Sequence, residues 1–186
     1  MRNFFNTFHT FESDCYVADY TKVTEGKKGV EFSTEPFEDI SYFKLQKLRT
    51  ASNYRGINLE KYPAFIQGIS NCECFFIPEV EVEKNWILFL ELKYCDKENI
   101  ENYGLTVVQQ MAAVLEKMND NSLIDITKYT VYFNFSSPDN RPPFTNFMLS
   151  CDTALKIKDK YQVKFLGFNH LLIATPQYIQ VPKKRI

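Results

Sequence analysis

Glu91 and Lys93 are the residues of this chain whose types and spacing are best suited to chemistry. They are two positions apart in the apolar stretch of residues 86–94, which has the character of a buried strand. Side chains at positions i and i+2 of a strand point to the same face. The sequence therefore predicts a carboxylate and an ammonium side by side on an apolar background, where two charges are costly. A strand-end ion pair and a site that needs positioned charges both fit this pattern.

Two further polar groups accompany this pair. Glu73 lies upstream in the apolar segment of residues 71–78, which predicts a second strand that carries one carboxylate. Gln110 lies downstream in residues 98–118, which are expected to be helical. There it is at the edge of a predicted core-facing stripe, and Gln109 is rotated by about 100° from it. The stripe consists of Ile100, Val107, Met111, Val114, Leu115 and Met118. Both glutamines could equally be ordinary residues of a helix surface.

This order of elements resembles the PD-(D/E)xK nuclease superfamily, the restriction-endonuclease-like fold. In that family an acidic residue begins one strand, an (Asp/Glu)-x-Lys triplet lies on the next, and the following helix often presents a Gln. The triplet here is Glu91-Leu92-Lys93, and Glu73 stands where the family usually has Asp. The resemblance covers residues 72–118. It implies one α/β domain over residues 1–186, with a central mixed β-sheet flanked by helices and a motif-bearing core at residues 36–135.

The resemblance also implies a metal-dependent nuclease. Mg²⁺ or Mn²⁺ would be held by Glu73 and Glu91, since hard cations prefer carboxylates and phosphate oxygens. Such a metal polarises a phosphoryl group and acidifies a bound water. Lys93 would orient that water or stabilise charge in the transition state. Gln110 would donate a hydrogen bond to the water or to a ligand carboxylate.

The identity of the upstream acid is open between Glu73 and Glu79, with Glu73 preferred. Glu79 matches the Pro-acid dipeptide but follows the apolar strand and lies close to the triplet. A hairpin turn at Lys84-Asn85 would put Glu91 opposite Pro78 and leave Glu73 beyond it. Because Pro78 cannot donate a ladder hydrogen bond, a bulge or register break there is expected to bring Glu73 closer to Glu91.

The rest of the chain predicts further strands and helices. Two strand-like stretches flank a turn at residues 26–29, and a helix is expected over residues 36–48, followed by a loop over residues 53–62. Strands are expected at residues 129–135, 162–168 and 171–174, with a short helix at residues 152–160.

The composition limits which kinds of partner the protein is expected to bind. The 186 residues are 45% apolar and 16% aromatic, which is typical of a globular protein with a sizeable core. A net charge of −1 argues against a surface that grips nucleic acid broadly, so contact would rely on local basic groups. The candidates are Lys44, Lys47, Arg49 and Arg55 around the expected helix, and Lys183, Lys184 and Arg185 at the end of the chain. The former are also compatible with a solvated helix face.

Cysteine and histidine usage indicates a reducing compartment and no zinc site. The chain has five Cys and no C-x-x-C pair, and Cys72 and Cys74 are expected to be small core residues flanking Glu73. His9 and His170 are the two histidines, and His170 is expected to be structural, at a strand edge. No run is long enough for a membrane span or resembles a signal peptide, so a cytoplasmic location is the default expectation.

Two functions follow as hypotheses. The first is a metal-dependent nuclease that hydrolyses phosphodiester bonds, of DNA in preference to RNA. The second is a catalytically inactive nuclease-like fold that binds protein or nucleic acid, which the Glu at position 73 and the low basicity favour. A homodimer or a protein partner is left open.

Overall fold

The computed structural model describes residues 8–149 and 152–183 of the chain. Its central element is a six-stranded mixed sheet in which the first three neighbouring pairs of strands are antiparallel and the last two pairs are parallel. In spatial order its strands are β1 (His9–Phe11), β5 (Tyr54–Asn58), β6 (Cys74–Pro78), β7 (Asn85–Leu92), β8 (Tyr129–Ser136) and β9 (Lys164–Leu166).

A second, five-stranded mixed sheet packs against one face of the first. Its only parallel pair in the described chain is β10 with β4, and its other neighbours are antiparallel. In spatial order the strands are β11 (Tyr178–Gln180), β10 (His170–Thr175), β4 (Phe43–Lys47), β2 (Cys15–Asp19) and β3 (Val30–Ser33).

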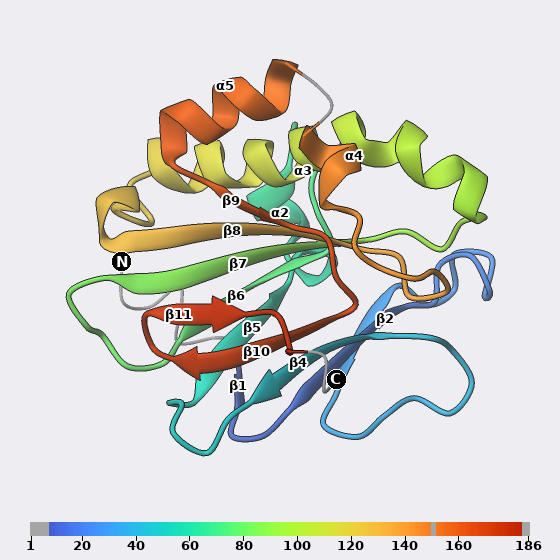
Figure 1. Ribbon diagram of the computed structural model, residues 1–186, viewed down its shortest axis with the longest axis horizontal. Helices are drawn as coiled ribbons and strands as arrows, with labels where there is room; N and C mark the ends of the chain where they lie inside the picture. The colour runs from blue at the N-terminus through green and yellow to red at the C-terminus, as the bar shows by residue number, and fades with distance from the viewer. Residues whose placement is uncertain (1–7, 150–151, 184–186) are drawn as a thin grey trace.

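Helices cover the other face of the six-stranded sheet, so the fold has three layers (Figure 1). The helices of this layer are α3 (Ile100–Asp120), α4 (Thr145–Leu149) and α5 (Asp152–Tyr161), and the short α2 (Pro63–Ile66) lies at the same side. Single 3-10 turns are η1 (Leu59–Lys61), η2 (Lys97–Asn99) and η3 (Ile126–Lys128). In the described residues, no helix combines the length and the apolar character that crossing a membrane requires.

The central sheet has one apolar core on each face, which explains the continuous apolar run of β7. Phe89 packs into the core under the helices, whereas Leu88 and Leu90 pack into the core between the two sheets. All eight residues of β7 are buried. A strand that is covered on both faces has no solvent side, so its sequence does not alternate between apolar and polar residues.

The predicted α/β class and mixed central sheet are confirmed, as is the long helix. All six residues of the predicted stripe are buried on α3. The prediction that helices flank the sheet holds for one face only, because the five-stranded sheet covers the other.

Two local predictions were wrong. Residues 36–48 do not form a helix. Their regular secondary structure is β4, in which Phe43 and Leu45 are buried and alternate with partly exposed Lys44 and Gln46. That period of two is a strand pattern, and it is realised by pairing with β2 and β10. The expected loop at residues 53–62 contains β5 and η1. β11 was not predicted at all.

Candidate active site

The pairing of β6 with β7 brings Glu73 next to Glu91. Cys74 lies opposite Leu90 and Phe76 opposite Leu88. Extending this register by one residue puts Glu73 opposite Glu91, and the main-chain N–H of Glu73 donates to Oε2 of Glu91 at 3.2 Å. The two carboxylates therefore lie at the same end of the central sheet.

The predicted hairpin register was wrong. Pro78 lies opposite Tyr54 of β5, not opposite Glu91, and a six-residue connection over 79–84 replaces the tight turn. Asn85 organises this connection, since its side chain accepts from the N–H of Val82 at 3.3 Å and donates to the carbonyl of Val80 at 3.1 Å. The longer connection, without any bulge at Pro78, is what aligns Glu73 with Glu91.

Glu91 and Lys93 form the ion pair that their spacing predicts. Nζ of Lys93 contacts Oε1 of Glu91. The Glu91 side chain is fully buried, whereas 24% of the Lys93 side chain is exposed, so the pair is open to solvent only on its ammonium side.

Burial and charge shift the titration of all three groups. Burial raises the pKa of Glu91 to about 7, although the positive charge of Lys93 and the hydrogen bond from Glu73 oppose this rise. Burial, together with the negative charge of Glu91, raises the pKa of Glu73. Burial alone would lower the pKa of Lys93, but its attraction to Glu91 outweighs burial and raises that pKa. Perturbed groups of this kind are typical of functional sites, although structural ion pairs show them as well.

Gln110 contacts the main chain of the segment that precedes Glu73. Its Nε2 donates to the carbonyl of Asn71 at 3.0 Å, and its Oε1 is buried with no hydrogen-bond partner among the described residues. The neighbouring Gln109 is exposed, as the helical period predicted. Gln110 thus holds the segment that leads into Glu73, a contact that the sequence did not predict, and its hydrogen bond to a carboxylate or to water stays a prediction.

A polar network that the sequence reasoning missed holds Lys93 from the other side. The N–H of Lys93 donates to the carbonyl of Ser136 at 2.9 Å, and the hydroxyl of Ser137 donates to the carbonyl of Lys93 at 2.9 Å. The side chain of Asn169 accepts from the N–H of Ser137 at 3.1 Å, and that of Asn140 donates to the Ser137 hydroxyl at 2.8 Å. The cluster of Ser and Asn directly after the strong β8 pattern was its only signal in the sequence.

Asp19 and Tyr94, which the sequence did not single out, line a cleft close to the pair. This cleft has a volume of about 470 Å³ and is also lined by Lys22, Asp39 and Asp139. The hydroxyl of Tyr94 donates to the carbonyl of Ser41 at 2.6 Å and accepts from the N–H of Asp19 at 3.3 Å. The charge of Asp19 contributes to the raised pKa of both Glu73 and Glu91.

The other predicted residues lie elsewhere. Glu79 pairs with Arg55 at 3.2 Å, at the opposite end of β6 from Glu73. The predicted basic helix face is absent, because Lys44 and Lys47 lie on β4 and Arg55 lies on β5. Lys44 pairs with Asp14 at 2.9 Å.

The remaining groups are structural or fall outside the described chain. Cys72 and Cys74 are fully buried, as predicted. Nε2 of His170 lies 3.0 Å from Oε1 of Gln46, within the second sheet. Lys184 and Arg185 of the predicted terminal basic group are outside the described residues.

The set of side chains that could hold a metal ion at this end of the sheet is small. Across residues 8–149 and 152–183, no three His, Cys, Asp or Glu side chains are grouped so that they could hold a metal ion. Glu73 and Glu91 could supply two carboxylates, and Mg²⁺ is commonly held by one or two carboxylates with waters and substrate phosphate. Oε2 of Glu91 accepts from the N–H of Glu73 and Oε1 contacts the Lys93 ammonium as an ion pair, so a cation there would share Glu91 with Lys93.

Comparison of the chain with protein-family models, with curated proteins and with solved structures finds no match.

Proposed function

We propose that the protein is a metal-dependent nuclease whose site lies at the end of β7. The observation that carries this proposal is the meeting of Glu73 with Glu91 and Lys93 at one end of the central sheet. A fully buried carboxylate beside a largely buried ammonium is expensive to retain for stability alone, because a well-packed apolar pair would often serve as well. A site that needs charge explains the arrangement more directly.

Each residue has a role in this proposal. Glu73 and Glu91 would hold Mg²⁺ or Mn²⁺, and the bound ion would supply an acidified water and a polarised phosphoryl group. Lys93 would stabilise the negative charge that develops on the phosphate, since its ammonium is the solvent-facing member of the pair. Gln110 acts as a positioning residue, because it holds the Asn71 carbonyl two residues before Glu73. DNA is the preferred substrate, and RNA is the alternative.

A second function has one observation in its favour. The described chain has no third acid grouped with Glu73 and Glu91, and Lys93 already neutralises Glu91. A nuclease-like fold that has lost metal binding would keep the same ion pair and act as a module that binds nucleic acid or protein.

Cleavage assays separate the two. Labelled single- and double-stranded DNA and RNA would be incubated with Mg²⁺, Mn²⁺ or a chelator, with the wild type and with Glu73→Gln, Glu91→Gln and Lys93→Met. We expect cation-dependent cleavage by the wild type and a loss of about 100-fold or more in each variant, as for the loss of a group that acts on the transition state. Circular dichroism would establish that each variant is folded.

Glu79→Gln is the matched control, because Glu79 is the other candidate acid in the sequence and pairs with Arg55 instead. It should keep wild-type cleavage. Failure of the folded wild type to cut any substrate with either cation would reject the enzyme and leave the binding module.

A further inference from the structure

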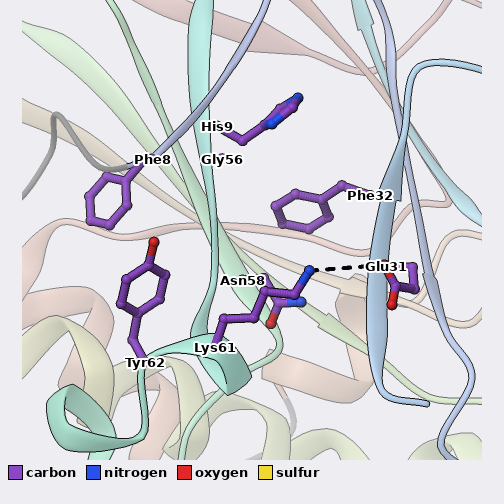
Figure 2. Close-up of a pocket in the computed structure, with 8 residues that line it drawn as sticks. All are labelled: Phe8, His9, Glu31, Phe32, Gly56, Asn58, Lys61 and Tyr62. Atoms are coloured by element: carbon purple, nitrogen blue, oxygen red, sulfur yellow. Dashed lines mark ion pairs between the residues drawn. The ribbon is translucent and has the colours of Figure 1, made fainter.

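A second cavity opens near the same end of the central sheet and is not used by the proposed chemistry. Its volume is about 420 Å³, within the range of small-molecule sites. Figure 2 shows Phe8 and Tyr62 on one side and Phe32 on the other, with Lys61 directed toward Glu31 between them. The lining residues are Phe8, His9, Glu31, Phe32, Gly56, Asn58, Lys61 and Tyr62.

The cavity lies at the side of the sheet where β1 pairs with β5. His9, the first residue of β1, pairs with Gly56, and both residues line the cavity. Gly56 lines the cavity, and a side chain there would collide with the rings of Phe11 and Phe76. The lack of a side chain at Gly56 therefore lets the buried rings of Phe11 and Phe76 pack closely against β5 beside the cavity.

Strand pairing connects this cavity to the candidate active site. Asn58 lies opposite Cys74, and the N–H of Leu59 donates to the carbonyl of Glu73 at 3.1 Å. Lys61 and Tyr62 follow directly in η1 and its C-cap. Only β6 separates β5 from β7, so the end of β5 is two strand spacings, about 10 Å, from Glu91. An extended strand of nucleotides can bridge that distance.

The chemistry of the lining fits an unpaired base. Phe32 and Tyr62 are partly buried aromatic residues that line the cavity. Ring contacts with Phe11 and Phe76 hold Phe32, and Tyr62 packs edge-on against Phe8. Aromatic faces stack on bases of any sequence. Lys61 and Glu31 are 4.0 Å apart and partly exposed, which provides one donor and one acceptor for polar groups of the ligand. A chain of net charge −1 has little general attraction for phosphates, so stacking would have to supply much of its affinity.

We propose that this cavity is a stacking subsite for one unpaired nucleobase of a single-stranded nucleic acid. The proposal rests on the proposed function, since it makes the same nucleic acid the ligand. It assigns the preferred substrate to single-stranded regions, because a base inside a duplex cannot enter the cavity without leaving the stack.

The test uses a single-stranded oligonucleotide that contains the fluorescent base 2-aminopurine, with chelator present so that no cleavage occurs. We expect binding of the wild type to quench the 2-aminopurine emission. Phe32→Leu keeps an apolar side chain but removes the ring, and should reduce the quenching and weaken binding about fivefold or more. Lys61→Gln alters an exposed residue, so the fold should be unaffected. Lys61→Gln should weaken binding of the oligonucleotide, and the slope of log affinity against log salt concentration should decrease in magnitude by about one.

Tyr178→Leu and Lys156→Gln are the matched controls, because Tyr178 is a partly exposed aromatic residue on β11 and Lys156 is an exposed lysine on α5. Both should bind and quench like the wild type. Unchanged binding and quenching in Phe32→Leu and Lys61→Gln would overturn the subsite, and so would the absence of any binding by the wild type.

Cleavage measured in parallel keeps the two proposals distinguishable. Cation-dependent cleavage without 2-aminopurine quenching would retain the nuclease and overturn the subsite. Quenching that depends on Phe32 and Lys61, without cleavage under any condition, would support the subsite and reject the nuclease.

Discussion

Glu91 combines full burial with two polar partners, and this combination determines how it responds to pH. The attraction of Lys93 and the N–H of Glu73 lower the cost of its negative charge, but burial still raises its pKa to about 7. Removing Lys93 alone would leave a buried carboxylate without its counter-charge, which is the costly way to break such a pair. For this reason the uncharged Glu91→Gln is the more informative variant for stability.

The free energy of unfolding should fall as the pH rises from about 4.5 to about 7. The pKa of Glu91 is higher in the folded chain than its ordinary value of 4.5, so the folded chain binds more protons across that window. The stabilisation from protonated Glu91 is fully present below about pH 4.5 and is lost as the pH rises past about 7. We expect a fall on the order of 1–3 kcal/mol in chelator, and a smaller fall in Glu91→Gln.

Urea unfolding at several pH values measures this dependence. Glu98→Gln is the control, since Glu98 is exposed on η2. A wild-type stability that is flat or rises across the window, or an equal fall in Glu91→Gln, would contradict the expectation.

At the scale of elements, α3 connects the helical layer to the start of β6. Its apolar stripe packs on the sheet, and Gln110 at the edge of that stripe donates to the Asn71 carbonyl. Gly104 allows α3 to approach α4 closely, because a side chain there would overlap the main-chain oxygen of Phe147. The helix therefore contributes to the site through the backbone position of the segment that precedes Glu73.

Gln110→Ala should destabilise the protein by about 1 kcal/mol, because it removes one partly buried hydrogen bond. Cleavage should fall as well, since the segment before Glu73 is no longer held. Gln109→Ala on the neighbouring, exposed position should leave both properties within about 0.5 kcal/mol of the wild type. Urea unfolding and the cleavage assay measure the two effects, and equal behaviour of the two variants would show that the Asn71 contact has no positioning role.

At the scale of the whole molecule, the central strands β6 and β7 connect the two apolar cores. β6 and β7 contribute side chains both to the core under the helices and to the core between the sheets. Loss of either outer layer would expose one apolar face of both strands. The two cores should therefore be stable only together.

We expect one cooperative unfolding transition. Trp86 is the single tryptophan and is buried between the two sheets, so its fluorescence reports on the sheet–sheet core. Far-ultraviolet circular dichroism near the helical bands reports mainly on the helical layer. The urea midpoints from the two signals should coincide. Separate midpoints would show that the five-stranded sheet can detach while the helical layer stays folded.

For β7 and α3, periodicity in the sequence by itself determined which face of the element the key residues occupy. It put Glu91 and Lys93 on one side of a buried strand and Gln110 at the edge of the α3 stripe, because these relations depend only on the strand and helix repeats. The preference for Glu73 over Glu79 agrees with the position of Glu73 beside Glu91.

Only the tertiary structure decided which strands pair and in which register. β4 became a strand through pairing with β2 and β10, segments that are distant in the sequence. The alignment of Glu73 with Glu91 depends on the length and side-chain contacts of the connection after β6. Such pairings are determined by contacts between remote residues, and a local pattern holds no information on them. The second sheet and the aromatic cavity at the end of β5 follow from the same long-range contacts.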